Sequence, residues 1–250
     1  GKGANLARLT QRGFPVPPGT VIVLRAYRDF IRPAAKLIES ARSFPFDDPA
    51  ALRECTLRLQ AELGGLHLPN ALASELDGFL RRKSPGHAYS VRSSSSLEDM
   101  AQAAFAGQHE TFLNCSTLRD ILEKTRLCYL SLWSDRAAAY RHKQGLDHAA
   151  AEMAVVVQRM AKAEAAGVGF SVNPVSGDLE ELVFDANFGL GESVVSGESE
   201  VDHFLVDKKT RALRSSKIAA KTLKISPAQE GVRTVRLSAL SLRFLPRRMT

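Results

Sequence analysis

The sequence predicts an α+β protein in two parts, a helix-rich part up to about residue 150 and a sheet-rich part after it. Residues 33–84 alternate apolar, helix-like stretches with helix breakers. Thr117-x-x-Asp120 has the pattern of a helix cap and predicts one long helix to about residue 141. From Met153 the chain changes to short β-branched runs separated by Asn, Pro and Gly. Residues 236–250 form a divergent basic tail.

Composition bounds the class of protein. The chain has 250 residues, of which 44% are hydrophobic and 24% charged, as in ordinary globular proteins. Its apolar runs are far shorter than the roughly 20 residues that a membrane-spanning helix needs, and its first residues do not form a secretory signal. We therefore expect a cytoplasmic protein with no membrane partner. Three scattered cysteines without a CxxC pair argue against a disulfide framework or a zinc site: Cys55, Cys115 and Cys128.

The positive charge does not by itself indicate a nucleic-acid partner. The net charge is +7 and the isoelectric point is about 9.5, but the basic residues are dispersed along the chain. Aromatic residues make up only 7%, whereas a nucleic-acid-binding surface usually combines a basic face with aromatics. A basic nucleic-acid-binding protein is therefore the less favoured alternative.

Periodicity predicts the individual elements. Helices are expected from residue 2 to the Gly13 region, over 25–31, over about 52–63 before Gly64-Gly65, and over about 72–80. The third of these is marked by Leu52, Leu57, Leu59 and Leu63. Strands are expected over 21–24, 88–91, 111–113, 154–160, 167–172 and 181–186, with a hairpin formed by 203–207 and 212–218. Trp133 is expected in the core, and Gly189-Leu190-Gly191 as a strand-to-helix turn.

Residues 88–114 carry the pattern most suggestive of chemistry. A short strand delivers Arg92 to a run of four serines, and a loop of small residues at 103–107 follows. A guanidinium offers a planar fork of donors, and small residues let backbone N–H groups approach an anion closely. These features suit a phosphate. The alternative is a solvated serine linker followed by an ordinary turn.

Several segments together resemble the N-terminal nucleotide-binding domain shared by phosphoenolpyruvate synthase, pyruvate phosphate dikinase and rifampicin phosphotransferase. The matching pieces, in the family's order, are GKGANLARL, GFPVPPGTVIVLRAYRDF, SVRSSSSLEDMAQAAFAGQHETFLN, SLWSDRAAAYRHKQG, VVVQRMAKAEAAGVGFSVNPVSG and FDANFGLGESVVSGESEVDHFLVDK. The resemblance implies an ATP-grasp-like fold in which two lobes clasp ATP. The first lobe would span 1–150, with the phosphate-binding loop at 92–111, and the second would span 151–235.

The resemblance also implies roles for six residues. Lys2 and Arg92 would hold the nucleotide phosphates and serve catalysis. Gly107 and Thr111 would belong to a loop that closes over the phosphates, and Gln158 and the backbone near Met160 would face the adenine. Other interpretations stay open for three of them. Lys2 could be a solvated lysine, Arg92 could pair with Glu98 or Asp99, and Gln158 could satisfy a neighbouring backbone group.

The implied reaction passes a phosphoryl group from ATP, through a phosphohistidine on a separate carrier domain, to pyruvate or a rifamycin-type acceptor. None of the six histidines has the sequence context of that phosphohistidine, and no carboxylate follows Glu230. We therefore expect a chain truncated at both ends, with partner domains and the Mg²⁺ ligands lying elsewhere. The alternative is a catalytically incomplete nucleotide-binding module that regulates a partner.

Overall fold

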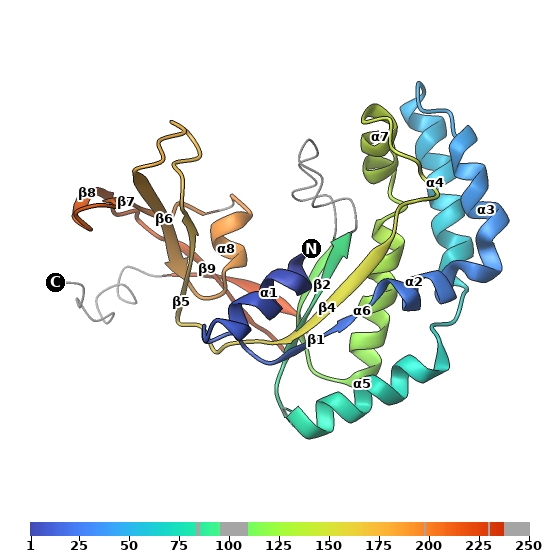
Figure 1. Cartoon of the computed structure of the whole chain (residues 1–250), viewed down its shortest axis with the longest axis horizontal. Coiled ribbons are helices and arrows are strands. Elements are labelled where there is room, and N and C mark those ends of the chain that lie inside the picture. Colours follow the sequence, from blue (N-terminus) through green and yellow to red (C-terminus); the bar gives the residue numbers. More distant parts are fainter. Residues whose placement is uncertain (84–85, 96–109, 198, 230, 238–250) are drawn as a thin grey trace. The chain divides into compact units, whose positions relative to one another are not determined.

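The computed structural model describes residues 1–83, 86–95, 110–197, 199–229 and 231–237 (Figure 1). The chain divides into two compact units, Gly1–Met160 and Ala161–Thr250. Each unit contains its own sheet and combines helices with strands, so the expected mixed α+β class is confirmed. Among the helices in the described ranges, none combines the length and apolar character needed to cross a membrane.

The first unit is built on a four-stranded antiparallel sheet. Its strands lie in the order β1-β4-β2-β3. Their bounds are β1 Gly19–Ile22, β2 Tyr89–Ser95, β3 Thr111–Cys115 and β4 Met153–Arg159. Strand β4 pairs with β1 on one side and with β2 on the other. Strand β4, which follows the expected lobe boundary near residue 150, pairs within the first unit, and this unit ends at Met160.

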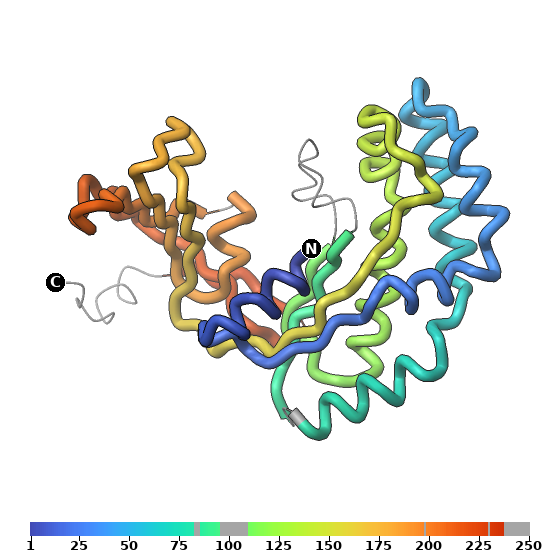
Figure 2. Tube along the Cα trace, viewed as in Figure 1, coloured from blue at the N-terminus to red at the C-terminus, as the bar shows by residue number. Residues whose placement is uncertain are grey.

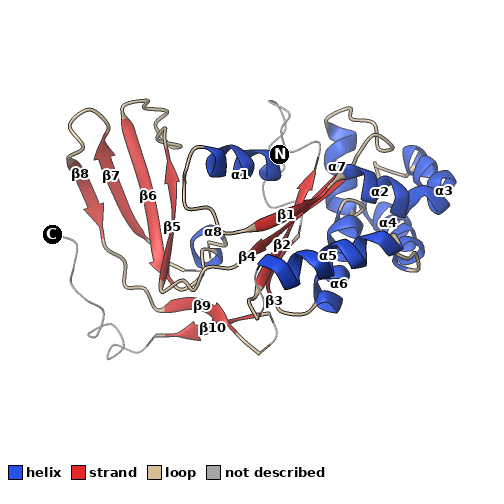
Figure 3. Cartoon of the chain, turned by 60° about the horizontal axis from the view of Figure 1, so that its bottom comes forward, coloured by secondary structure: helices blue, strands red, loops and turns tan. Residues whose placement is uncertain are grey.

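The helices of the first unit lie on both sides of this sheet (Figure 3). Helix α1 lies on one side, while α2 and α6 contact the sheet on the other and α4, α5 and α7 pack around α6 and one another. Their bounds are α1 Lys2–Gln11, α2 Leu24–Ile31, α3 Ala35–Ser40, α4 Pro49–Gly64, α5 Asn70–Lys83, α6 Leu118–Ser131 and α7 Asp135–Lys143, with 3₁₀ turns at Arg32–Ala34 and Ala41–Ser43.

The hydrophobic core fills the space between the sheet and the larger helical layer. The Trp133 indole N–H donates to the Tyr27 hydroxyl over 3.0 Å, and Tyr129 packs against Tyr27 and Phe30 at ring separations of 5.2 and 5.3 Å. All four aromatic residues are almost fully buried. The expected core position of Trp133 is thus confirmed, and its polar N–H is satisfied inside the core, as buried indoles require.

The long helix expected from Thr117 to about residue 141 is wrong in its second half. The Thr117 cap itself is confirmed, because its hydroxyl accepts from the Asp120 N–H. Helix α6 ends at Ser131, however, and α7 begins at Asp135 with Ser134 as a new N-cap that accepts from the Ala137 N–H. A serine that can satisfy helix-end N–H groups favours a new helix start over continuation.

Two smaller expectations also differ from the structure. Leu24 begins α2 instead of ending the preceding strand, which stops at Ile22. Leu57 was counted on the buried face of α4 but is 55% exposed, whereas Leu52, Leu59 and Leu63 are buried. Positions separated by seven and four residues share a helix face, and Leu57 is five residues from Leu52, which turns it away from that face.

The second unit contains a four-stranded antiparallel sheet whose strands follow one another in chain order. Its segments run from gold to red in Figure 2. Its strands are β5 Ala165–Phe170, β6 Glu181–Phe188, β7 Asp202–Asp207 and β8 Leu213–Lys217. The expected hairpin is confirmed as β7 and β8. The expected strand-to-helix turn is confirmed too, since Gly189–Gly191 join β6 to α8, Glu192–Val195. Strands β9, Leu223–Pro227, and β10, Val232–Arg236, form a separate antiparallel pair that the sequence did not predict.

Candidate functional site

The two faces of the first sheet have different characters. Alternate residues of a strand point to opposite faces. On one face Tyr89 and Val91 of β2, with Val155 and Val157 of β4, pack into the core beneath the helices. The other face therefore carries the intervening residues of these strands: Ser90, Arg92 and Ser94 of β2, with Val156 and Gln158 of β4. This second face is called the α1 face below, because α1 lies on it.

A row of paired residues crosses the α1 face. Val21 of β1 pairs with Val156 of β4, Val156 pairs with Arg92 of β2, and Arg92 pairs with Thr111 of β3. Paired residues in neighbouring strands lie side by side and share a face. Thr111, predicted from the loop after the serine run, is thus the direct cross-strand neighbour of Arg92, although 18 intervening residues separate them in the sequence.

Arg92 is half-buried on this face. Among the described residues, no carboxylate or hydrogen-bond acceptor is paired with its guanidinium, whereas Arg28 forms a two-bonded pair with Glu152 and Arg42 one with Asp147. Glu98 and Asp99, the partners considered for Arg92 from the sequence, lie outside the described residues. A partly desolvated guanidinium without a counter-ion is a suitable binding group for an anion.

Helix α1 brings Lys2 onto the same face. The Lys2 backbone N–H donates to the Ser94 hydroxyl over 3.1 Å, and Ser94 lies two residues beyond Arg92 on that face of β2. The first turn of α1 contains no acidic residue. The partial positive charge of a helix N-terminus therefore adds to the charges of Lys2 and Arg92.

The chain on either side of residues 96–109 is held together by Ser93. Both its backbone N–H and its hydroxyl donate to the Glu110 carbonyl, over 3.2 and 3.0 Å. Together with the pairing of Arg92 and Thr111, these bonds place both flanks of that segment beside the α1 face. Gly107, the other predicted loop residue, lies outside the described residues.

Gln158 lies on the α1 face opposite Gly19 and Ser90 and is only 8% exposed. Its side-chain amide donates to the Pro17 carbonyl over 3.0 Å. One interpretation left open by the sequence was that Gln158 satisfies a neighbouring backbone group. The structure shows such a bond, from the Gln158 side chain to Pro17. Because a carbonyl can only accept, this bond fixes which end of the amide is the NH₂ group and leaves the amide oxygen as its acceptor end.

Met160 follows β4 and extends its pairing. Its N–H donates to the Ala88 carbonyl over 2.9 Å, the Arg159 N–H donates to Pro18, and the Met160 sulfur accepts from the Asn114 N–H. The backbone near Met160 is expected from the sequence resemblance to face the adenine, which requires backbone groups that are free to bond to the base. The structure shows a central strand, and the N–H groups of Arg159 and Met160 bond within the unit.

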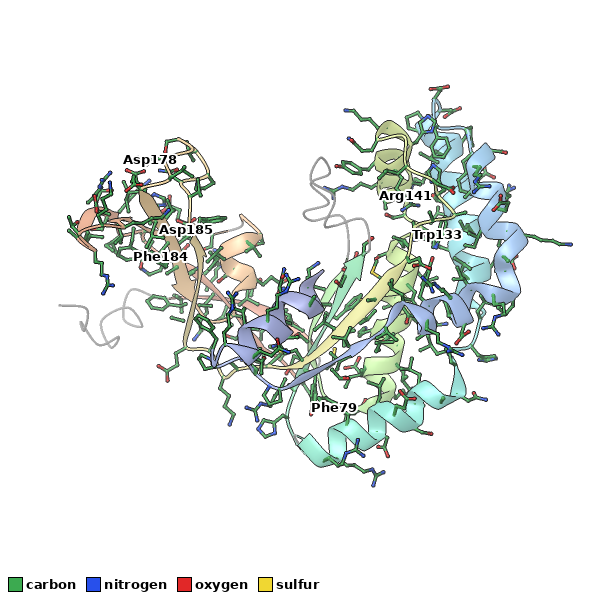
Figure 4. The ribbon with its side chains drawn as sticks, in the orientation of Figure 1. Phe79, Trp133, Arg141, Asp178, Phe184 and Asp185 are labelled. Carbon is green, nitrogen blue, oxygen red and sulfur yellow. The ribbon has the colours of Figure 1, made fainter. Side chains whose placement is uncertain are left out.

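The structure thus brings Lys2, Arg92, Thr111 and Gln158 from four distant segments onto one face of one sheet. Ser94 lies on the same face, although no individual role was expected for it from the sequence. The only sequence signal for it was its place in the serine run, because its bond to Lys2 spans 92 positions. Figure 4 labels other residues of both units, including Trp133 and Arg141 in the first.

Other candidate sites are less favourable. Among the described residues, no group of three or more His, Cys, Asp or Glu side chains is arranged to hold a metal ion. Cys115 and Cys128 are buried and unoxidised, and burial raises the pKa of the Cys115 thiol to about 12, so it does not provide a thiolate nucleophile at neutral pH. A cavity of about 300 Å³ lies in the second unit, lined by residues that include Glu164, Phe188 and Lys224. None of the described residues predicted to bind the nucleotide lines this cavity.

Comparison with known proteins gives the face a context. Residues 1–243 match the family model for the pyruvate phosphate dikinase AMP/ATP-binding domain. The chain is 33% identical over 265 residues to a probable phosphoenolpyruvate synthase of Pyrococcus horikoshii, a match that covers 90% of the chain and 32% of the relative. It is 37% identical over 227 residues to a rifampicin phosphotransferase of a Streptomyces species, covering 89% of the chain and 25% of the relative.

The chain therefore spans about a quarter to a third of the length of these curated relatives. The family match covers almost the whole chain and includes every described residue of the α1 face. The chain belongs to the pyruvate phosphate dikinase AMP/ATP-binding domain family.

Proposed function

We propose that the α1 face binds the phosphates of ATP, with Arg92 and Lys2 as the principal cationic groups. The observation that carries this proposal is the half-buried Arg92 guanidinium, which has no counter-ion among the described residues and lies close to the N-terminus of α1. A bound polyphosphate would form charge-assisted hydrogen bonds with cationic groups on this face. Arg92 supplies a planar fork and Lys2 a point charge.

We assign the remaining residues of the proposed site roles that agree with their positions in the first unit or in the sequence. Thr111, exposed beside Arg92, would donate its hydroxyl to a phosphate, and Gly107 would supply a backbone N–H from the closing loop. Gln158 would face the adenine. Its NH₂ group bonds to Pro17, so its amide oxygen would accept from the exocyclic amine of adenine. Near Met160 the carbonyl, and not the bonded N–H, would be the backbone group offered to the base.

The complete site would be of the ATP-grasp type. Phosphoryl transfer depends mainly on positioning and charge neutralisation, for which Mg²⁺ supplies part of the charge when it is bound. The described residues hold no cluster of three or more potential ligands, so we assign no Mg²⁺ ligand in this chain. The residues that we assign here bind and orient the phosphates.

In the longer protein we propose that the phosphoryl group passes from ATP to a histidine of a carrier domain. It would then reach pyruvate or a rifamycin-type acceptor on a further domain, in the cytoplasm. Support comes from the relatives named phosphoenolpyruvate synthase and rifampicin phosphotransferase, which are three to four times as long as the matched part. The alternative function is that of a nucleotide-binding regulatory module. It is favoured by the residues given after Glu230, which contain no carboxylate.

Substitution of Arg92 tests the phosphate assignment. Arg92→Ala should weaken ATP binding, measured by isothermal titration calorimetry, by roughly 10- to 150-fold, since hydrogen bonds to charged groups contribute about 1.5–3 kcal/mol. Arg58→Ala is the matched control, because Arg58 is an exposed arginine of the same unit that pairs only with Glu54 among the described residues. Equal affinities for ATP in the Arg92→Ala chain and the unmodified chain would refute the assignment.

A further inference from the structure

We propose that Ser94 and Gly3 position the first turn of α1 on the sheet, and that they thereby place Lys2 beside Arg92. Neither residue would contact the nucleotide, so both act through Lys2. This inference rests on the proposed role of Lys2 and Arg92 in phosphate binding. The inference explains how Lys2 and Arg92, which are 90 positions apart in the sequence, are held close together.

The first contact is the bond between Lys2 and Ser94. The Lys2 N–H is one of the N-terminal helix donors that have no partner within the helix. It donates to the Ser94 hydroxyl over 3.1 Å, and Ser94 is only 5% exposed. Ser94 is fixed in turn by its place in β2, where it pairs with Ala154 of β4. A helix terminus is therefore anchored to a rigid strand two residues from Arg92.

The second contact is the close approach of Gly3 to β1. A Cβ atom at Gly3 would lie 2.8 Å from one methyl carbon of Val21 and 3.3 Å from the other. Real Cβ atoms essentially never approach other atoms as closely as the first of these distances. Val21 begins the row that continues through Val156 to Arg92. The missing side chain of Gly3 therefore lets α1 approach the same row that carries the guanidinium.

The rest of α1 provides little anchoring. Within the described residues, no side chain of this helix is buried. Leu9, which the sequence places on the apolar side of the helix, is 40% exposed. A helix with so little buried surface gains little packing energy from the sheet. Individual contacts at its first turn consequently have a large influence on where Lys2 lies.

Hydrogen exchange without nucleotide tests the anchoring by itself. The Lys2 amide, followed by NMR, should exchange about tenfold faster in Ser94→Ala than in the unmodified chain, because it loses the Ser94 hydroxyl as a hydrogen-bond acceptor. Ser94→Thr keeps the hydroxyl and should retain most of the protection. Ser131→Ala is the matched control, since Ser131 is 7% exposed and donates within α6. Unchanged exchange in Ser94→Ala would overturn the anchoring, whatever the chain does with ATP.

ATP titrations then test whether the anchoring serves Lys2. Ser94→Ala should weaken ATP binding about fivefold, as expected for the loss of one hydrogen bond, while Ser131→Ala should not change it. In a Lys2→Met chain the same Ser94→Ala change should have less than about a twofold effect, because residues acting through one another are not additive. Equal effects of Ser94→Ala with and without Lys2 would contradict positioning and indicate general destabilisation.

Gly3 provides an independent pair of variants. Gly3→Ala should weaken ATP binding severalfold, and Gly3→Ala combined with Val21→Ala should restore it, because the second change removes the two methyl groups that the new Cβ would strike. Failure of the double variant to recover would contradict the inference. If the unmodified chain does not bind ATP, the proposed function fails, and the exchange experiment still decides whether Ser94 anchors Lys2.

Discussion

Arg141 is a buried arginine of the first unit with a structural role, and its surroundings differ from those of Arg92. Its side chain is fully buried, donates to the Leu132 carbonyl over 2.6 Å, and lies over the Trp133 ring at 5.1 Å (Figure 4). Burial lowers its pKa to about 10, so it remains charged at neutral pH. Its bond to Leu132 satisfies a carbonyl near the junction of α6 and α7. Arg92, by contrast, is half-buried with no such partner among the described residues.

His148 completes the environment of Arg141. The Arg141 Nε–H donates to His148 Nδ1 over 3.4 Å, so His148 accepts at Nδ1 and carries its proton on Nε2. Burial, with smaller contributions from the charges of Arg141 and His142, lowers the pKa of His148 from 6.5 to about 4. The imidazole is therefore neutral in the folded chain at pH values where an unfolded chain would protonate it.

This shift predicts a loss of stability in mild acid. Between pH 6.5 and 4 the unfolded chain binds a proton at His148 that the folded chain does not, so the free energy of unfolding falls as the pH falls, by about 2 kcal/mol in total. His148→Asn keeps an acceptor for Arg141 and removes the titration. Urea unfolding at pH 7 and pH 4.5 should show a smaller pH-dependent loss in His148→Asn than in the unmodified chain. Equal losses would exclude this linkage.

At the scale of elements, the link from β6 to α8 depends on one glycine. Gly189 has a φ of +79°, and a Cβ there would lie 2.2 Å from the Ile225 carbonyl oxygen of β9. Leu190 donates its N–H to that same carbonyl over 2.8 Å. The turn and β9 are therefore in direct backbone contact, which leaves no room for a side chain at position 189.

Alanine variants of two glycines distinguish the cost of a left-handed backbone conformation from the cost of a steric clash between the new Cβ and β9. Gly177 has a φ of +75° with no atom within 4 Å of a Cβ, so Gly177→Ala should cost only about 1–2 kcal/mol for the left-handed conformation. Gly189→Ala should cost about 2–3 kcal/mol more, because β9 must move. Hydrogen exchange of the amides of β6 and β9 measures the difference. Similar protection in both variants would show that the contact with Ile225 is easily relaxed.

Helices and strands could be predicted from the sequence where a local residue pattern is compatible with only one type of secondary structure. The leucine spacing of α5, the Thr117 cap of α6 and the β-branched run of β4 each specify an element without distant contacts. The break at 132–134 was missed because a serine inside a helical pattern becomes a cap only if the preceding helix stops. Strands β9 and β10 were missed because each has only five residues and they pair with each other, so no long apolar run marks them in the sequence.

At the scale of the whole molecule, the site combines segments whose proximity depends on the strand order. Motif resemblance named Lys2, Arg92, Thr111 and Gln158, and strand pairing places the last three around a central β2–β4 ladder. Local patterns could not provide the order β1-β4-β2-β3, because antiparallel neighbours distant in sequence leave no periodic signal. For the same reason, Ser94 could not be singled out among its neighbouring serines before its bond to Lys2 was seen.

A carrier-phosphorylation experiment distinguishes the two proposed functions of the chain, namely part of a phosphotransferase and a regulatory nucleotide-binding module. We expect the chain alone, incubated with ATP and Mg²⁺, to form no phosphohistidine product, because the carrier that would accept the phosphoryl group is not recognisable in its sequence. Adding a separately expressed carrier domain from one of the longer relatives should yield a phosphorylated histidine on that domain, detected by mass spectrometry at neutral or alkaline pH.

The Arg92→Ala chain provides the decisive comparison in that mixture. If the α1 face positions the transferring phosphates, Arg92→Ala should lower the rate of carrier phosphorylation by about 100-fold or more, because transfer depends on charge neutralisation at the phosphates. Arg58→Ala should leave the rate unchanged. A chain that binds ATP through Arg92 yet never phosphorylates the carrier would support the regulatory alternative, since binding would then be separated from transfer.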